Sequence, residues 1–149
     1  NLSAMTTIAA SSAVKTRTFD ISNAMEHHGY PMNDGMQMRH RINGKLFDSS
    51  RIDENISANT NEIWVFDNSK GDEPHPMHLH GVFFQVLGRS GGRGNLIASE
   101  NGWKDTVLVM PGETVRVIVP FENNTGKFVF HCHNLEHEDD GMMLQYQLS

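Results

Sequence analysis

The sequence predicts an all-β domain, arranged as a Greek-key sandwich or barrel. Eight short runs with alternating or β-branched apolar residues recur along the chain, which is the pattern of β-strands. Segments rich in Gly, Asn and Pro separate these runs and predict turns. The 149 residues suffice for one domain with a sizeable buried core.

The predicted strands follow one another to the end of the chain. In order, they cover residues 15–21, 39–47, 62–67, 81–88, 106–109, 114–121, 127–132 and 143–148. Turns are predicted at residues 43–44, 68–71, 90–94, 111–112 and 123–126. Residues 135–139 suit a helical turn, and the sequence has no visible internal repeat.

Residues 1–13 are expected to form a linker-like lead to a single domain that covers residues 14–149. The lead is rich in small and polar residues, and it lacks the basic start and long apolar stretch of a signal peptide. Because the chain begins at Asn1 rather than Met, we expect it to be a piece of a longer protein.

Composition excludes several classes of partner. The net charge of −6, without a basic patch in the sequence, argues against nucleic acid as a partner. No apolar run approaches the length that spans a membrane. A single cysteine rules out an internal disulfide, so its thiol is better explained as a metal ligand.

A segment near the C-terminus carries the strongest chemical signal. Cys132 lies between His131 and His133, and His137 and Met142 follow shortly after. One thiolate, imidazoles and a thioether are the ligands of a blue-copper electron-transfer centre, in which two His and one Cys bind strongly and a Met binds weakly. The segment therefore predicts a copper site.

A second cluster contributes His75, His78 and His80, so that the two segments together hold six of the nine histidines. In a strand, residues i and i+2 share a face and residue i+1 points to the other. Alternation therefore groups His75 with Cys132 on one face. The other face receives His78, His80, His131 and His133.

The two predicted groups differ in their ligand chemistry. The first is a mononuclear Cys/His site that His137 and Met142 complete from the turn after Cys132. The second has four imidazoles and no anionic ligand, which indicates part of a larger metal cluster. The backbone of Cys132 would join the two sites by a short covalent route for an electron.

Each interpretation has an alternative. The motifs could form a buried histidine cluster without metal, or a zinc site, since zinc also takes Cys and His ligands. The coincidence of two motifs argues against the first, and the axial-type Met favours copper over zinc. In an isolated domain, His78 and His80 could instead be solvated or bind an adventitious metal.

Other polar segments are less specific. The acidic run of Glu136, Glu138, Asp139 and Asp140 suits a solvated loop better than a site that attracts cationic or cuprous donors. A Met- and His-rich segment suits core filling better than Cu(I) binding; it contains Met25, His27, His28, Met32, Met36, Met38 and His40. Asp105 either orients a metal ligand or holds a turn.

The two histidine motifs, HPMHLHG and HCHNLEHEDDGMM, resemble the C-terminal copper signatures of multicopper oxidases, the family of laccases, bilirubin oxidases and cuprous oxidases. Further segments are similar to the last domain of the bacterial, bilirubin-oxidase-like branch: residues 41–47, 51–53, 102–107 and 111–115. The resemblance covers the chain from about residue 15 to the end, and it implies a third, C-terminal domain with the cupredoxin fold.

The resemblance implies a role for each ligand. By it, His75, Cys132 and His137 bind the type 1 copper, and Met142 is the axial ligand. His78 would bind the type 2 copper. The type 3 copper pair would use His80, His131 and His133.

The chain departs from the family in what it lacks. In the resembled oxidases, an N-terminal domain completes the trinuclear cluster with two further His-x-His motifs. Only His27, His28 and His40 are left over here, and the adjacent His27 and His28 do not make such a pair. The chain is therefore expected to hold half of the oxygen-reducing site and to be unable to reduce O₂ alone.

The implied function is that of a laccase-like oxidoreductase domain. It would accept single electrons from phenolic, aromatic or metal donors and pass them through Cys132 to His131 and His133, toward a trinuclear copper cluster that reduces O₂ to water. The alternative is a stand-alone blue-copper electron carrier, truncated or engineered. A nitrite-reductase-like domain is less favoured, because that family is expected to have one histidine beside the cysteine.

The resemblance also implies the setting of the chain. Its partners would be the other cupredoxin domains of the parent oxidase, together with small phenolic, aromatic or cuprous donors. The parent would be exported to the periplasm or the extracellular space. These expectations depend on the family resemblance alone.

Overall fold

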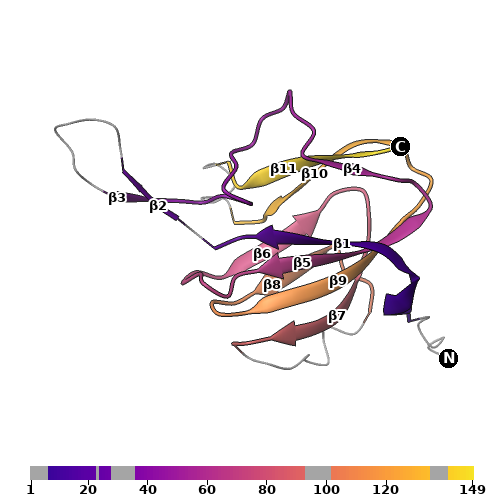
Figure 1. Cartoon of the computed structure of the whole chain (residues 1–149), viewed down its shortest axis with the longest axis horizontal. Helices are drawn as coiled ribbons and strands as arrows, with labels where there is room; N and C mark the ends of the chain where they lie inside the picture. Colours follow the sequence, from indigo (N-terminus) through magenta and orange to yellow (C-terminus); the bar gives the residue numbers. More distant parts are fainter. Residues whose placement is uncertain (1–6, 23, 28–35, 93–101, 135–140) are drawn as a thin grey trace.

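The architecture of the computed structural model is two facing β-sheets with a hairpin that projects from one end (Figure 1). Residues 7–22, 24–27, 36–92, 102–134 and 141–149 are described. The elements are η1 (Ala10–Ser12), β1 (Ala13–Asp20), β2 (Ala24–His27), β3 (Met36–Arg39), β4 (Glu54–Ile56), β5 (Thr60–Asp67), β6 (His75–Leu79), β7 (Gln85–Ser90), β8 (Thr106–Val109), β9 (Thr114–Phe121), β10 (Gly126–Cys132) and β11 (Met143–Leu148).

The first sheet has the order β1-β5-β9-β7 and the second the order β4-β11-β10-β6-β8. β1 pairs with β5 in parallel, and β5 pairs with β9 antiparallel. In the second sheet, β10 lies between β11 and β6 and is antiparallel to both. The predicted all-β sandwich class is therefore confirmed. Within the described ranges, no helix has the length and hydrophobicity to cross a membrane.

Aromatic side chains fill the space between the sheets. Strand alternation turns Trp64 and Phe66 of β5 inward, and both are fully buried. The Trp64 ring lies 4.9 Å from the Phe130 ring of β10 and 5.7 Å from the Tyr146 ring of β11, centroid to centroid. Aromatic pairs of this kind contribute about 0.5–1.5 kcal/mol beyond the area that they bury. They join the sheet that carries β6 and β10 firmly to the other.

A buried polar side chain supports the start of β6. Asn68 follows β5 and is fully buried. Its Nδ2 donates to the carbonyl of Glu73 at 2.8 Å and to that of Met110 at 3.2 Å. Because a buried amide that lost these partners would be costly, Asn68 fixes the turn that leads into His75.

Some strand predictions are wrong. Residues 39–47 do not form one strand: β3 ends at Arg39, and a tight turn at Asn43 and Gly44 follows, closed by one bridge between Ile42 and Lys45. Asn43 and Gly44 have φ values of 53° and 69°, as a type I′ turn requires, so the turn replaces a continuous strand.

The strand predicted at residues 81–88 begins later, at Gln85, and runs to Ser90. Gly81 has a φ of 80°, which turns the chain after β6 before the next strand can begin. β6 was not among the predicted strands, although the grouping of its histidines used strand alternation. Pro76 has no N–H to donate to a neighbouring strand. Its carbonyl accepts a bond of 2.6 Å from the His133 N–H.

The remaining differences concern short elements and the N-terminal lead. β2, β3 and β4 have four, four and three residues and were not predicted. In the lead, residues 10–12 form a short 3₁₀ turn, and the N–H of Ile8 donates to Gln85 Oε1 at 2.8 Å. The division at residue 13 stays a prediction. The helical turn predicted at residues 135–139 lies outside the described residues.

Candidate metal centre

Two neighbouring strands position the histidines of both motifs. β6 and β10 are antiparallel, with His78 opposite His131 and Met77 opposite Cys132. Residues opposite each other share a face, and the faces alternate along each strand. The pairing therefore separates the side chains into a buried face, toward the core, and an exposed face, toward the end of the sheet.

The buried face brings Cys132 and His75 together. Both are fully buried, and Cys132 Sγ lies 3.5 Å from His75 Nδ1. For metal bonds of about 2.3 Å to sulfur and about 2.0 Å to nitrogen, this separation corresponds to an angle at the metal of about 109°, which is tetrahedral. The pair therefore fits two ligands of one copper or zinc ion.

Met142 lies beside this pair in the fold. It is fully buried, and its backbone carbonyl accepts a hydrogen bond of 3.2 Å from the Cys132 N–H. The backbone of the predicted axial ligand is thus fixed to that of the thiolate residue. His137, the other predicted ligand, lies outside the described residues. The acidic run from Glu136 to Asp140 lies there too.

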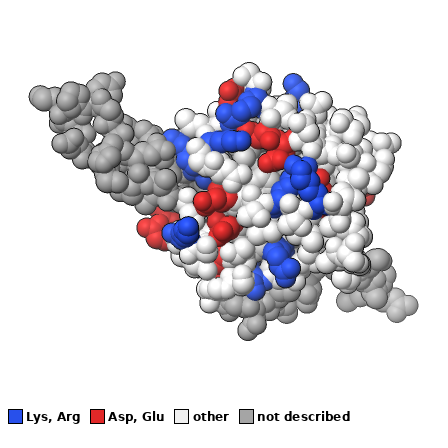
Figure 2. All heavy atoms as spheres, viewed as in Figure 1, with Lys and Arg blue, Asp and Glu red and all other residues white. Residues whose placement is uncertain are grey.

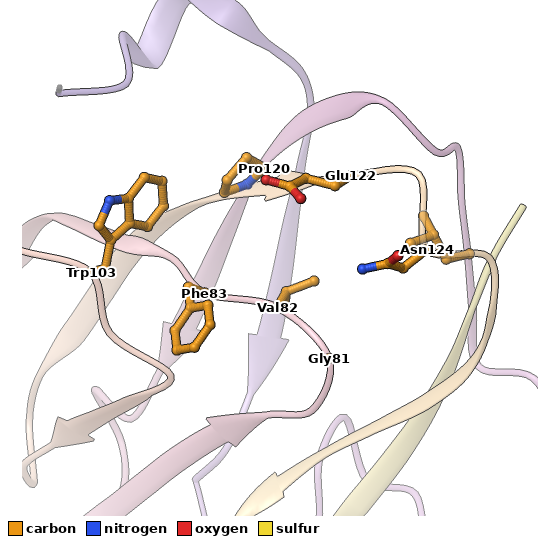
Figure 3. A pocket seen from close by; sticks show the side chains of 8 residues that line it. Gly81, Val82, Phe83, Trp103, Pro120, Glu122 and Asn124 are labelled. Atoms are coloured by element: carbon orange, nitrogen blue, oxygen red, sulfur yellow. The ribbon is translucent and has the colours of Figure 1, made fainter.

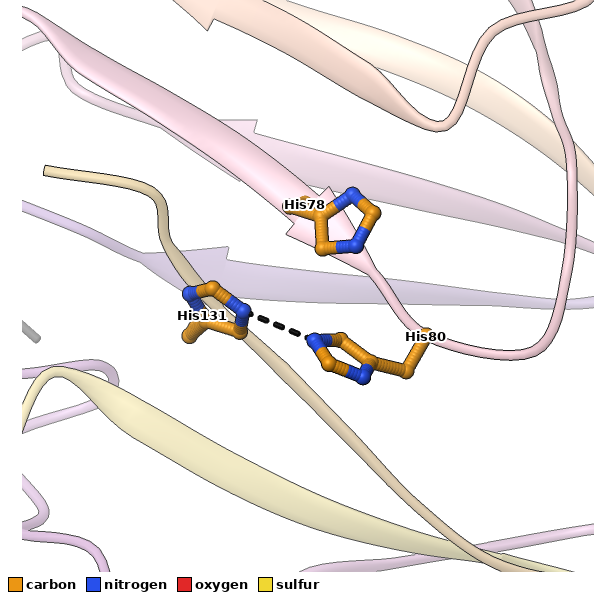
Figure 4. A group of neighbouring side chains, drawn as sticks. All are labelled: His78, His80 and His131. Atoms are coloured by element: carbon orange, nitrogen blue, oxygen red, sulfur yellow. Dashed lines mark hydrogen bonds between the residues drawn. The ribbon is translucent and has the colours of Figure 1, made fainter.

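The exposed face gathers the other histidines. His78, His80 and His131 each offer a ring nitrogen, and these atoms lie within 4.8 Å of one another (Figure 4). The ring of His133 lies 5.5 Å from that of His78 and 5.6 Å from that of His131. We call these four residues the histidine group. All four come from the ends of β6 and β10, and their convergence fits a metal cluster rather than a single buried histidine.

Contacts at Nδ1 orient the ring of His78. Its Nδ1–H donates to the Asp105 carbonyl at 2.9 Å, and Nδ1 also lies 3.1 Å from Thr106 Oγ1. Such partners fix the tautomer of a metal-binding histidine and leave Nε2 for the metal. Sequence reasoning left the role of Asp105 open; its carbonyl is the contact here, and its carboxylate is 3.9 Å away.

Thr106 was missed as a functional residue. It lies directly opposite His78 in the β6–β8 register, and its hydroxyl donates to Asp105 Oδ1 at 3.0 Å. The contact depends on which residues of two distant strands meet. No local pattern in residues 106–109 signals it.

The ring of His131 is hydrogen-bonded to the backbone of Cys132. Its Nδ1–H donates to the Cys132 carbonyl at 3.1 Å, since a carbonyl can only accept. In the neutral ring, His131 Nε2 is then an acceptor, and His80 Nε2–H donates to it at 2.9 Å (Figure 4). A metal lies about 2.0 Å from an imidazole nitrogen, so both nitrogens are close enough to bind the same ion or adjacent ions.

His40 lies near the buried face. Its Nε2 is 3.0 Å from Glu73 Oε2, and its ring lies 6.5 Å from the His75 ring. The rest of the Met- and His-rich segment remains a prediction. Residues 28–35, with His28 and Met32, lie outside the described residues, as do the side chains of β2 and β3, with Met25, His27, Met36 and Met38.

An apolar hollow begins at Gly81, the residue that follows His80 in the chain. It has a volume of about 440 Å³. Phe83 and Trp103 line it and are 61% and 47% exposed, with Pro120 and Glu122 at the end of β9 (Figure 3). Large apolar side chains so exposed around a hollow are typical of a surface that packs against another protein part.

The charged side chains show no comparable concentration in the view of Figure 2. There, the Lys and Arg side chains alternate with Asp and Glu across the sheet that carries β1 and β5. Arg17 of β1 forms ion pairs of 2.6 Å with Glu54 and Glu62. The hydrogen bond to Glu62 raises the pKa of Arg17 and outweighs burial, which acts in the opposite direction.

Comparisons with known proteins place the chain among copper enzymes. A family model described as multicopper oxidase matches residues 16–149. The multicopper oxidase mco of Staphylococcus haemolyticus is 38% identical over 141 residues, which cover 93% of this chain and 30% of that protein. A laccase of Haloferax volcanii is 44% identical over 108 residues, covering 72% of this chain and 18% of the relative.

Solved structures agree with the sequence comparisons. The McoA multicopper oxidase of the hyperthermophile Aquifex aeolicus is similar over 99% of this chain, with a TM-score of 0.80 and 32% identity. A laccase from Pediococcus acidilactici is similar over 96%, with a TM-score of 0.74 and 36% identity. This chain covers 32% and 28% of those two chains, so it spans less than a third of the length of such relatives.

Proposed function

Because the chain belongs to the multicopper oxidase family, we propose that it is the domain of a laccase-like oxidase that carries the type 1 copper. Its place would be the third, C-terminal domain of the parent. Cys132, His75, His137 and Met142 would hold the type 1 copper. The histidine group would hold its half of the type 2 and type 3 coppers.

One observation carries this proposal: the thiolate residue and the histidine group lie on opposite faces of the same two strands. Cys132 Sγ is buried 3.5 Å from His75 Nδ1, whereas the three histidines with converging nitrogens are 4.8 Å or less apart on the other face. A zinc site would not need the second group, and a simple electron carrier would not need it either.

The residues of the buried face suit one-electron transfer. When bound there, copper supplies single-electron redox chemistry, and a Cys/His/His/Met ligand set is the one that blue-copper sites use. Cys132 and His75 are held in strands β10 and β6 and enclosed by the core, so their positions need little change between oxidation states. Phenolic, aromatic or reduced-metal donors would reduce this site.

Cys132 and His131 provide the route between the faces. They are neighbours in β10, and the 3.1 Å hydrogen bond from His131 Nδ1–H to the Cys132 carbonyl adds a second link. An electron would pass from Cys132 to His131 and His133. In the parent protein, the completed trinuclear cluster would then use such electrons to reduce O₂ to water.

Other cupredoxin domains would complete the site. The chain covers 30% of a relative that it matches over 93% of its own length, which leaves room for further domains in a parent of that size. The exposed Phe83 and Trp103 line the hollow that begins directly after His80, and they support a further domain packed against this surface. We also propose that the parent is exported, as the family resemblance implies.

A copper count with an oxygen electrode tests the proposal. The isolated chain should bind about one copper tightly, turn blue and consume no oxygen with a phenolic donor. The parent oxidase should bind about four and consume oxygen. If the isolated chain bound copper without the intense visible absorption of a copper–thiolate bond, the type 1 assignment would be wrong.

The alternative function is a stand-alone electron carrier with the same blue site. The converging nitrogens of His78, His80 and His131 speak against it, because a carrier has no use for them. Oxygen consumption that appears when the chain is joined to the rest of an oxidase would exclude the carrier. Unchanged activity of a parent in which these three histidines are replaced would favour it.

A further inference from the structure

We propose that Tyr146 is a positioning residue for His80: its hydroxyl holds the His80 carbonyl, so that the exposed imidazole stays aimed at the histidine group. The inference rests on the proposed metal-binding role of that group. It concerns a residue outside the two histidine motifs and a contact made by the backbone rather than by an imidazole.

His80 has a different environment from its two neighbours. His131 is only 3% exposed, and the ring of His78 is fixed by the Asp105 carbonyl and Thr106. His80 is exposed, yet its Nε2 lies 2.9 Å from His131 Nε2. Packing of surrounding side chains therefore limits the His80 ring least of the three, and the position of its backbone matters most.

Two hydrogen bonds fix the His80 backbone, one at its N–H and one at its carbonyl. Its N–H donates to the Val129 carbonyl of β10 at 3.0 Å. Its carbonyl accepts a hydrogen bond from the Tyr146 hydroxyl, which reaches it from β11. His80 is the first residue after β6, so these two bonds fix its backbone at the point where the strand has ended.

The next residue is held by the same aromatic pair. Gly81 has a φ of 80°, and a Cβ there would lie 2.5 Å from the Phe128 ring. Phe128 is stacked on Tyr146, with ring centroids 5.5 Å apart and an interplanar angle of 27°. The turn after His80 therefore lies against a surface built by Phe128 and Tyr146, and the Tyr146 hydroxyl is the polar part of that surface.

The Tyr146 hydroxyl donates from a fixed position, because the residue is fully buried. The His80 carbonyl has no proton, so it can only accept this bond. Because the partner of the hydroxyl is a backbone atom, the bond fixes the backbone position from which the His80 side chain extends toward the other histidines.

The test is the Tyr146→Phe variant of the full chain, which removes one oxygen and keeps the ring. One equivalent of Hg²⁺ first occupies the Cys132 thiolate, since soft metals prefer sulfur. Zn²⁺ is then titrated calorimetrically. We expect the Zn²⁺ affinity to fall roughly 10-fold, the lower end of the range for residues that orient metal ligands. NMR relaxation should show faster motion of the His80 ring without metal.

Two comparisons separate positioning from a general loss of stability. Thr60→Val removes another hydroxyl–carbonyl bond, from Thr60 Oγ1 to the Ser57 carbonyl at 2.7 Å. Thr60 begins β5 in the other sheet, so this variant should leave Zn²⁺ binding unchanged. In a His80→Ala background, Tyr146→Phe should have no further effect on Zn²⁺ affinity.

The outcomes distinguish this inference from the proposed function. Unchanged Zn²⁺ affinity in Tyr146→Phe, or an equal loss with His80→Ala already present, would overturn the positioning role and leave the proposed function intact. If His80→Ala alone left Zn²⁺ affinity unaltered, the histidine group would not bind metal through His80, and the inference would fail together with that part of the proposed function.

Discussion

The two faces of β6 and β10 both carry histidines, but in opposite settings. On the buried face, Cys132 and His75 are fully enclosed by the core. On the exposed face, His80 and His133 are open to solvent, and only His131 is buried. Alternation along a strand is enough to separate two metal environments that the sequence interleaves residue by residue.

The comparison teaches what a single domain could complete by itself. In the proposed function, the buried Cys132 and His75 would belong to a site whose ligands all come from this chain. The exposed imidazoles would need a second protein surface to enclose them. We therefore expect the two faces to respond independently to mutation.

The largest expected effect is that of Cys132→Ser. It removes the only thiolate, so the visible absorption of the copper-loaded chain should disappear completely. Zn²⁺ binding by the histidine group should persist, because its nitrogens lie on the other face. The buried hydroxyl costs about 1–3 kcal/mol of stability, so the melting curve must be recorded as well. Persistence of the colour would refute the type 1 assignment.

Replacing His131 and His133 together by alanine should have the converse effect. The blue absorption should remain largely intact, since neither side chain points toward Cys132 Sγ. Zn²⁺ binding by the histidine group should be lost, because His131 supplies one of its three converging nitrogens. Absorption spectra and calorimetry on one sample measure both. Loss of the blue colour in a folded variant would mean that the two faces are not separate.

A smaller effect is expected for Thr106→Val, which keeps the side-chain shape and removes the hydroxyl 3.1 Å from His78 Nδ1. The Asp105 carbonyl remains, so Zn²⁺ affinity should fall about 10-fold rather than more. Thr114→Val is a matched control, because the Thr114 hydroxyl bonds Asp67 instead. Equal losses in the two variants would show that the effect is not local to His78.

The smallest change in stability is expected for Met142→Leu. The side chains have similar volumes, so the free energy of unfolding should change by less than about 1.5 kcal/mol. The blue colour should remain while the reduction potential rises, because the weak axial thioether is lost. Redox titration followed by absorbance measures this. A potential that falls, or does not move, would argue against Met142 as the axial ligand.

Much of the fold and of the site could be predicted from local patterns. The runs that became β5, β8, β9, β10 and β11 alternate clearly, and the grouping of His75 with Cys132 followed from the same periodicity. β6 was harder to predict because Pro76 opposes a central strand, and its place depends on the neighbours β8 and β10.

The residues that sequence reasoning missed act across strands. Thr106 and Tyr146 belong to no sequence motif. Their contacts to His78 and to the His80 carbonyl depend on how β6 pairs with β8 and β10, and on how β10 pairs with β11. Register is set by the whole sheet rather than by the residues on either side. Asp105 was expected either to orient a metal ligand or to hold a turn, and its backbone carbonyl contacts His78 Nδ1.

The most direct test of the central claim is X-ray absorption at the copper edge on the chain loaded with one equivalent of copper. The account predicts one sulfur neighbour at bonding distance together with imidazole nitrogens, and its loss in Cys132→Ser. A copper environment of nitrogen and oxygen alone in the unaltered chain would contradict a type 1 site at Cys132.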